Sequence, residues 1–466
     1  MDERGYIRRT CAVNLRMQSH APTFFDRHVP PSPSLLPAAQ ALRWIGQPYA
    51  FLEDCERQFG DVFTIDFGSQ GRYAVFSHPE AIRSILTADF RVLHVGAGNA
   101  VLTAILGPGS LLMLEEQRHV RERRLLMPAF HQKTIVRYGE VIQETVLAAT
   151  AHWSPGCEFV AQELLQDISI DVILRAVFGV RARDTCAELK QGLIALLNDR
   201  RLGLGLLARL RDATPHPAMV DFQAQFDRVS QLTKALVAER RASGQGREDD
   251  MLSMLLEARD EDGQRRSDDE LRDELITLVA TGHETTATAL AWGLYWIATS
   301  PGIEERLRNE ISNVAAPPDA KAYAQLQYLD ATCKEVLRIY PIVPSVFRQV
   351  VQPFSVAGYD FAPGDVLSPS IYLAHHREDV YPNAREFEPD RFIRRAYSPY
   401  EYLPFGGGGR RCIGMQFALY EMKVAIVTLL RRYSLAVAPG QQVVPKRRSV
   451  TVAPSGGVRM IVKDVL

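Results

Sequence analysis

The sequence predicts a mainly α-helical protein with a small β portion, and three observations carry this prediction. Helix-compatible patterns dominate from about residue 117 to residue 340. Runs rich in β-branched and aromatic residues are short and lie outside most of that region. No repeat period or low-complexity tract is evident. We therefore expect helices to build the body of the fold and strands to form a minor part.

The first strands are expected at 62–67 and 73–76, joined by a Gly-containing turn at 68–71. Strands are expected again within 345–370. A further strand is expected near the C-terminus, where residues 449–452 are rich in β-branched side chains.

A long helix is expected in the middle of the chain. It begins at a Ser267-x-x-Glu270 capping box and meets no proline until Pro301. At ~1.5 Å per residue it would span roughly 50 Å. Gly282 and several threonines within 281–286 oppose helix formation, and threonine hydroxyls can bond back to preceding carbonyls. This pattern suggests a functional distortion, although a solvated polar patch on a surface helix would explain it equally well.

A glycine-rich loop ahead of another apolar helix holds the most informative cysteine. Residues 405–414 read Phe-Gly-Gly-Gly-Gly-Arg-Arg-Cys-Ile-Gly and place Cys412 at the helix start. The apolar positions that follow have the spacing of a buried helix; they are Ile413, Phe417, Tyr420, Val424 and Val427. Neighbouring arginines, a helix N-terminus and glycine N–H groups favour a thiolate, which suits a metal ligand. A packed or surface thiol is the alternative, whereas a phosphate loop is excluded because no Lys-Ser or Lys-Thr follows.

The same segment resembles the signature of the cytochrome P-450 family, the haem-thiolate monooxygenases. The matching positions are Phe405, Gly408, Arg410, Cys412 and Gly414. The resemblance implies a single-domain P-450 fold with haem b as cofactor and Cys412 as the axial ligand of its iron. It also implies that Phe405, Arg410 and Gly414 contribute to cofactor binding.

The threonine-rich segment of the long helix resembles the family's oxygen-activation motif. On that resemblance Glu284 and Thr285 form an acid–alcohol pair that delivers protons. Thr281 stands where the family usually carries Ala or Gly. Its additional hydroxyl and methyl would either narrow the pocket or hold an extra water, and the sequence leaves both outcomes open.

A carboxylate and two arginines are expected to form a structural network. Glu335 and Arg338 lie three residues apart on one helical face, which alone would indicate an ordinary surface pair. The segment 387–392, Phe-Glu-Pro-Asp-Arg-Phe, follows at the distance seen in the family and adds Arg391. The resemblance implies a buried network that supports the cysteine loop and takes no part in catalysis.

Several cations are candidates for holding the two haem propionates. His119 and Arg123 are four residues apart, as in the propionate-binding helix of bacterial family members. Arg348, after a Pro-rich turn, and Arg410 resemble further propionate contacts. Taken alone, each of these charged side chains would be expected on a solvent-exposed face of the protein.

The substrate pocket is assigned by resemblance to residues that are mostly apolar. The candidates are Ile276, Val279, Ala280, Thr281, Val343, Ser345, Val346, Val450 and Thr451. Residues 202–207 are interpreted as a mobile lid or, with equal weight, as a plain helix–loop junction.

The chain has 466 residues, 46% of them hydrophobic and 23% charged, as in globular proteins. We expect an N-terminal extension at 1–33, which is mobile, and one haem-thiolate monooxygenase domain at 34–466, because the motifs must converge on one cofactor. No run of ~20 apolar residues occurs, and six scattered cysteines without a Cys-x-x-Cys pair indicate reduced thiols. A net charge of −1 offers no case for nucleic acid or acidic membranes. The expectation is a cytoplasmic monomer without a membrane anchor.

The expected function is insertion of one atom of O₂ into a hydrophobic substrate such as a fatty acid, terpene, steroid or polyketide-like molecule. About fifty residues follow Cys412, too few for a reductase domain, so electrons are expected from a ferredoxin or flavodoxin with its reductase. Arg121, Arg124 and Arg411 are a candidate docking patch. The alternatives are a haem-thiolate peroxygenase or isomerase and, from another class, a non-catalytic haem-binding sensor.

Overall fold

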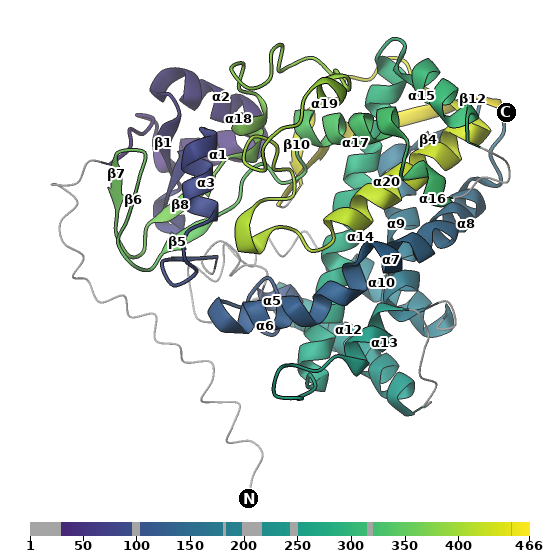
Figure 1. Cartoon of the computed structure of the whole chain (residues 1–466), viewed down its shortest axis with the longest axis horizontal. Coiled ribbons are helices and arrows are strands. Elements are labelled where there is room, and N and C mark those ends of the chain that lie inside the picture. The colour runs from purple at the N-terminus through teal and green to yellow at the C-terminus, as the bar shows by residue number, and fades with distance from the viewer. Residues whose placement is uncertain are drawn as a thin grey trace, which may run out of the picture.

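The computed structural model describes residues 29–95, 103–179, 183–197, 217–242, 250–314, 320–448 and 450–466. The prediction of a mainly helical fold with small sheets is confirmed. Figure 1 shows the main sheet with the first helices on one side of the molecule and most of the long helices on the other.

The helices of the N-terminal and central chain are α1 (Pro37–Gly46), α2 (Pro48–Phe59), α3 (Pro79–Leu86), α5 (Thr103–Leu106), α6 (Glu116–Leu126), α7 (Gln132–Ile135), α8 (Gly139–Thr150), α9 (Ala161–Phe178), α10 (Arg183–Leu197), α12 (Pro217–Ala242) and α13 (Met251–Glu257). The later helices are α14 (Asp268–Thr299), α15 (Ile303–Ser312), α16 (Ala320–Tyr323), α17 (Gln327–Ile339), α18 (Ile371–His375), α19 (Arg391–Arg394) and α20 (Met415–Arg432).

The largest sheet has the strand order β1 (Val62–Asp66), β2 (Arg72–Phe76), β8 (Val366–Pro369), β5 (Arg348–Val350) and β3 (Leu93–His94). Only β2 and β8 pair in parallel. The smaller sheets are β4 (Glu158–Val160) with β12 (Arg459–Val465) and β9 (Tyr433–Val437), β6 (Phe354–Val356) with β7 (Tyr359–Phe361), and β10 (Pro445–Arg448) with β11 (Thr451–Pro454). The expected early hairpin is therefore present. Within the expected strand 449–452, β11 begins at Thr451 and Ser449 lies outside the described residues.

Helix α14 is the central element of the helical part (Figure 1). The predicted capping box is present, because Ser267 accepts the Glu270 N–H and the Glu270 carboxylate accepts the Ser267 N–H. The predicted distortion at 281–286 is not seen, and α14 is continuous for 32 residues. The Thr281 and Thr285 hydroxyls donate to carbonyls four residues earlier, at 2.7 and 2.8 Å, without opening the helix.

One large apolar core surrounds α14. Its buried side chains come mainly from α8, α9, α14, α17 and α20. A second cluster fills the space between α3 and the five-stranded sheet. The last residues of the expected N-terminal extension are held against β1, since the Thr64 N–H donates to the Pro31 carbonyl at 2.7 Å; residues 1–28 lie outside the described residues.

Candidate haem-thiolate site

The cysteine loop lies directly ahead of α20. The Cys412 N–H donates to the Phe405 carbonyl at 2.9 Å, which closes the loop on itself. The Gly414 N–H is directed at the Cys412 sulfur, as expected for a sulfur at a helix N-terminus. Cys412 keeps accessible surface on one side while protein atoms surround it on the others.

The expectation that these surroundings favour a thiolate needs a correction. Burial raises the pKa of the Cys412 thiol above its usual range, and this effect exceeds the lowering by Gly414, Arg123 and Arg411. The protein alone therefore keeps a thiol at this position. A coordinated metal ion would deprotonate it outright.

Glycine is required at 408 for steric reasons. Its φ is +63°, and a Cβ there would lie 1.8 Å from the Leu86 carbonyl oxygen at the end of α3. Gly409, by contrast, has nothing within 4 Å of a Cβ. Close packing on α3 therefore positions this part of the loop.

Four predicted cofactor-binding groups, three arginines and His119, converge beside the cysteine, although they come from three separate segments. His119 and Arg123 lie on α6, Arg348 on β5, and Arg410 ahead of Cys412. Burial, followed by the charges of the three arginines, lowers the pKa of His119 to about 3. Burial and the Arg410 charge lower the pKa of Arg348 to about 10. These mutual effects show that the four groups are close together.

The cluster carries more positive charge than its surroundings balance. Glu115 forms an ion pair with Arg410. Arg348 donates to the Phe347 carbonyl at 2.7 Å. The Arg123 side chain has no hydrogen-bond or ion-pair partner among the described residues, and burial lowers its pKa. Buried cations without counter-ions are costly, so a ligand that brings two carboxylates beside the thiol fits these residues.

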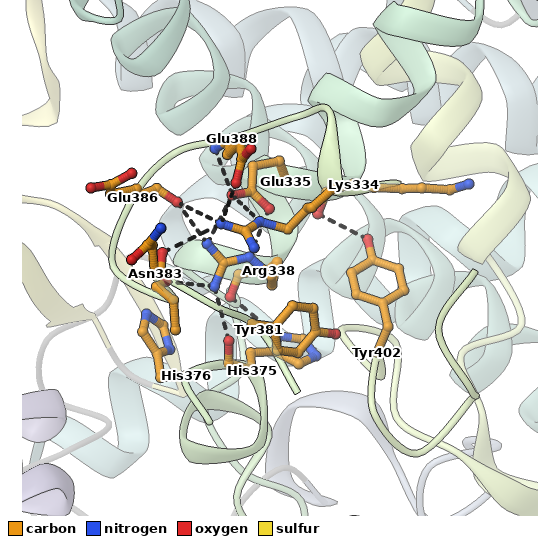
Figure 2. Close-up of polar contacts among 12 residues, drawn as sticks. Lys334, Glu335, Arg338, His375, His376, Tyr381, Asn383, Glu386, Glu388 and Tyr402 are labelled. Atoms are coloured by element: carbon orange, nitrogen blue, oxygen red, sulfur yellow. Dashed lines mark hydrogen bonds and ion pairs between the residues drawn. The ribbon is translucent and has the colours of Figure 1, made fainter. Parts of the chain in front are cut away.

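The second predicted group is the network around Glu335, which Figure 2 shows. Arg338 donates to both Glu335 carboxylate oxygens, at 2.7 and 2.8 Å. Its remaining N–H groups donate to the carbonyls of His375, Ala384 and Glu386. All five donors of this fully buried guanidinium are therefore satisfied.

Arg391 completes the network from α19. It donates to Glu335 at 3.0 Å, and the Glu388 N–H donates to the same carboxylate oxygen at 2.8 Å. The structure thus brings Glu335, Arg338 and Arg391 together in the interior, where a surface pair was the alternative.

His375 is a member of this network that sequence reasoning missed. Its Nδ1 lies 3.2 Å from the Arg338 carbonyl, and its Nε2 accepts the Leu403 N–H at 2.9 Å. Burial, followed by the Arg338 charge, lowers its pKa well below the usual range, so it is neutral with the proton on Nδ1. Leu403 lies two residues before Phe405, so His375 links the charged network to the cysteine loop. No spacing in the sequence marks a single histidine for this role.

A polar stripe follows one face of α14 through the interior. Thr277, Thr281 and Thr285 are four residues apart, and each hydroxyl donates to the carbonyl one turn earlier. Thr281 is exposed although it lies in the middle of the helix. This face of α14 is therefore not covered by side chains of the described residues at Thr281.

The two members of the expected acid–alcohol pair point to different partners. The Thr285 hydroxyl donates to the Thr281 carbonyl. Glu284 instead faces the β10–β11 hairpin, where its Oε1 lies 3.5 Å from Arg448 Nε. The Thr451 hydroxyl lies near the carboxylate and donates to the Arg448 carbonyl at 2.8 Å. Burial raises the pKa of Glu284, while Arg448 and then Thr451 lower it by a smaller amount.

Two predicted pocket residues of α14 lie in the core instead. Ile276 and Val279 are fully buried among apolar side chains. At ~100° per residue they lie roughly 140–160° around the helix from Thr281. They therefore pack on the opposite side of α14, whereas Ala280 is half-buried at the edge of the stripe.

The remaining predicted pocket residues have different environments. Val343 and Val346 are half-buried, and Ser345 is buried with an Oγ that has no hydrogen-bond partner. Thr451 is buried against Glu284, whereas Val450 is exposed at the hairpin turn. The predicted lid at 202–207 lies outside the described residues.

The expected docking patch is not a group of free cations. Arg121 pairs with Asp260 at 2.8 Å, and Arg124 pairs with Glu261. Arg411 is exposed beside Cys412. The loop after α13 therefore neutralises two of the three arginines.

No group of three or more His, Cys, Asp or Glu side chains suited to a metal ion occurs in the described part of the chain. Within the same residues, no helix is both long and apolar enough to cross a membrane.

Comparison with known proteins identifies the family of the chain. A model of the cytochrome P-450 family matches residues 30–460. Cytochrome P-450 135B1 of Mycobacterium tuberculosis is 34% identical over 443 residues, which cover 93% of this chain and 91% of the relative. Cytochrome P-450 135A1 of the same organism is 33% identical, with 93% and 94% covered.

Solved structures with the same fold span almost the whole chain. A cyanobacterial protein, CYP120A1 with bound retinoic acid, has a TM-score of 0.82 and 25% identity, covering 94% of this chain and 100% of that one. A cytochrome P-450DA haem domain has a TM-score of 0.84 and 24% identity, covering 94% and 98%.

Fold and site together define a haem-thiolate oxidoreductase. The chain belongs to the cytochrome P-450 family and is a P-450 monooxygenase.

Proposed function

We propose that this monooxygenase binds haem b and oxidises a hydrophobic small molecule: a fatty acid, terpene, steroid or polyketide-like compound. Electrons come from a separate ferredoxin or flavodoxin with its reductase. The observation that carries the proposal is the convergence of three arginines, Arg123, Arg348 and Arg410, and the neutral His119 beside Cys412, where Glu115 forms an ion pair with Arg410.

Each group of residues has a distinct role in this proposal. Bound haem supplies the redox-active iron that activates O₂. Cys412 would ligate the haem iron, and His119, Arg123, Arg348 and Arg410 would hold the propionates. The Glu335 network keeps the cysteine loop in place through His375 and Leu403.

Proton delivery is assigned to Glu284 and Thr285. Burial raises the pKa of Glu284, so its carboxyl retains a proton to higher pH than a solvated one would. Arg448 opposes this effect and holds the carboxylate at the hairpin. Release from Arg448 would let Glu284 turn toward Thr285, which lies next to it on the same helix.

The substrate class follows from the walls of the site. Val343 and Val346 are apolar and half-buried. The unpartnered Ser345 hydroxyl adds one polar group near them, which suits a mainly apolar guest with a single oxygen function. The retinoic acid bound to the cyanobacterial neighbour has this character.

The haem-thiolate assignment is tested by reducing the purified protein under carbon monoxide. A red-shifted Soret band, lost in C412S, is the expected result. A band without the red shift in the folded wild type contradicts the proposal.

The substrate class is tested by titrating fatty acids, terpenes, steroids and retinoic acid while the iron spin state is recorded. Conversion of low-spin to high-spin iron by apolar guests is expected. S345A should lower the affinity for guests that carry a carboxyl or hydroxyl group, and it should leave the affinity for hydrocarbons unchanged.

Two comparisons separate this function from its alternatives. Turnover with peroxide that exceeds turnover with a reduced partner would indicate a peroxygenase. A sensor would show no turnover, and its ligand binding would be indifferent to T285A.

A further inference from the structure

Two neighbouring carboxylates of α14 hold the loop between α5 and α6, residues 107–115, which we call the α5–α6 loop. The Gly109 N–H donates to Asp273 Oδ2 at 2.8 Å. The Leu111 N–H donates to Glu274 Oε2 at 2.9 Å. Asp273 and Glu274 are each 2% exposed, so both contacts lie in the interior. A backbone N–H that donates to a carboxylate makes a stronger hydrogen bond than a neutral pair does.

Glycine lets the α5–α6 loop lie this close to α14. Gly107 has a φ of +79°, and a Cβ there would overlap the Asp273 carboxylate. A Cβ at Gly109 would lie 2.9 Å from Asp273 Oδ2. Ser110, which is fully buried, adds a third contact because it accepts the Thr277 hydroxyl at 2.8 Å. The loop therefore has a closely defined position on α14.

The other side of the same loop contacts Arg410, one of the arginines beside the cysteine. The Leu111 carbonyl accepts Arg410 Nη1 at 3.4 Å. Glu115, the last residue of the loop, forms an ion pair with Arg410. Leu111 thus donates its N–H to Glu274 and offers its carbonyl to Arg410. A single residue connects the interior carboxylate of α14 with the guanidinium in the cofactor site.

Glu274 is the member of this arrangement that can change its charge near neutral pH. Its Oε1 is buried and has no hydrogen-bond partner among the described residues. Burial raises the pKa of Glu274 to about 7, and Glu122 of α6 and Asp273 also raise it. The Leu111 N–H and the Arg266 charge lower the pKa without cancelling the effect of burial. Arg266 itself pairs with Glu122 at 2.6 Å.

We propose that Glu274 is a positioning residue for the cofactor site and acts on Arg410 through Leu111. This inference rests on the proposed function, in which Arg410 holds a haem propionate. An ionised acceptor makes a stronger hydrogen bond than a neutral one, and bonds within one network strengthen each other. Ionised Glu274 therefore holds the α5–α6 loop more tightly than protonated Glu274, and the contact of Arg410 with the propionate tightens as pH rises through about 7.

The test is resonance Raman spectroscopy of the haem-loaded full-length protein, because the propionate-bending bands report hydrogen bonds to the propionates. In the wild type these bands should shift between about pH 6 and about pH 8. E274Q keeps an acceptor for the Leu111 N–H but cannot ionise, so its bands should stay at the low-pH position of the wild type. E274A removes the acceptor, and its bands should be displaced throughout the range.

Two controls separate this role from a general effect on the fold. D268N removes an exposed carboxylate at the start of the same helix, and its bands should titrate like those of the wild type. The infrared band of the protonated Glu274 carboxyl should disappear near pH 7 in the wild type and be missing from E274Q. A purely structural role would lower the stability of E274Q without removing the pH dependence of the propionate bands.

Two results would overturn the inference. One is a set of wild-type propionate bands that stay fixed across this pH range. The other is an E274Q variant whose bands shift with pH as those of the wild type do. Both results require a bound, thiolate-ligated haem, so they contradict this inference alone, whereas a protein without such a haem contradicts the proposed function. If E274A does not fold, the comparison of the wild type with E274Q decides.

Discussion

At Cys412 two opposing effects act on one thiol. Arg123, Arg411 and the Gly414 N–H favour the charged sulfur, while burial favours the neutral one and is the larger effect. The same balance applies to His119, which burial and three arginines keep neutral. Both groups are therefore prepared to contact a ligand that brings a metal ion and carboxylates. The protonation state of each of these residues follows only when its burial is considered together with its charged neighbours.

Removing the Arg448 charge should raise the pKa of Glu284. Arg448 is the larger of the two groups that offset the effect of burial on this carboxyl. In R448Q the protonated carboxyl should persist to higher pH, whereas R448K should remain near wild type. The carboxyl stretching band in infrared difference spectra reports this, with E284Q to assign the band. An unchanged titration in R448Q would show that Arg448 does not act on Glu284.

Substitutions at Thr281 should separate its size from its polarity. T281A removes a hydroxyl and a methyl, which leaves room for about one more CH₂ group, worth ~0.8 kcal/mol or roughly fourfold in affinity. Spin-state titration with a homologous guest series should show this gain for the bulkier members. T281V has nearly the wild-type volume and should show no such gain. An equal gain in T281V would mean that the hydroxyl, and not the space, limits binding.

Elements position these residues through a few contacts between segments far apart in the chain. The end of α3 supports the glycine loop, His375 joins α18 to that loop, and the β10–β11 hairpin holds Glu284 on α14. The first two contacts involve backbone groups, which have little freedom to move. The geometry of the site therefore depends on these supports as much as on the residues that bind haem.

G408A should disturb the cysteine loop, whereas G409A should not. The new Cβ at 408 meets the Leu86 carbonyl oxygen at 1.8 Å in a left-handed conformation, which costs at least ~2 kcal/mol. The reduced-carbon-monoxide spectrum should lose most of its thiolate-ligated band in G408A. Position 409 has free space, so G409A is the matched control. Equal spectra for the two variants would contradict this account of the loop.

E335Q should destabilise the fold strongly, because it leaves Arg338 and Arg391 buried with a neutral partner. Breaking a buried ion pair costs about 3–5 kcal/mol. D390N breaks the nearby exposed pair with Arg306, and less than about 1 kcal/mol is expected for such a pair. Urea unfolding followed by circular dichroism measures the loss of stability in each of the two variants. Similar midpoints for E335Q and D390N would remove the structural role proposed for the network.

The sequence predicted local features better than long-range ones. The capping box located the start of α14, and the early hairpin was placed within a residue or two. Ile276 and Val279 were assigned to the pocket because a motif gives a position in the chain but not the side of the helix that faces the site. The contact of Glu284 with Arg448 spans more than 160 residues, and no spacing pattern encodes it.

For the whole molecule, average properties conceal the features that matter. A net charge of −1 offers no case for nucleic acid or acidic membranes, yet three arginines, Arg123, Arg348 and Arg410, gather around His119. The interior is apolar on average, yet some ionisable groups lie within the apolar core. Glu421 of α20 is one of them: it is buried, its Oε1 has no hydrogen-bond partner, and Ser169 of α9 lies close enough to lower its pKa.

Glu421 should make the protein less stable as pH rises toward 8. Burial raises its pKa to about 8 in the folded state, and Ser169 offsets only part of this. The unfolded chain releases the proton near pH 4.3, so between these values the folded state holds one more proton than the unfolded state. The free energy of unfolding should fall by about 1.4 kcal/mol per pH unit in this window because of Glu421 alone. E421Q cannot ionise, so its advantage over the wild type should grow by roughly 3 kcal/mol between about pH 5 and pH 7 in urea unfolding. E140Q, at an exposed position of α8, should run parallel to the wild type. If E421Q also runs parallel, the core carboxyl does not hold the additional proton.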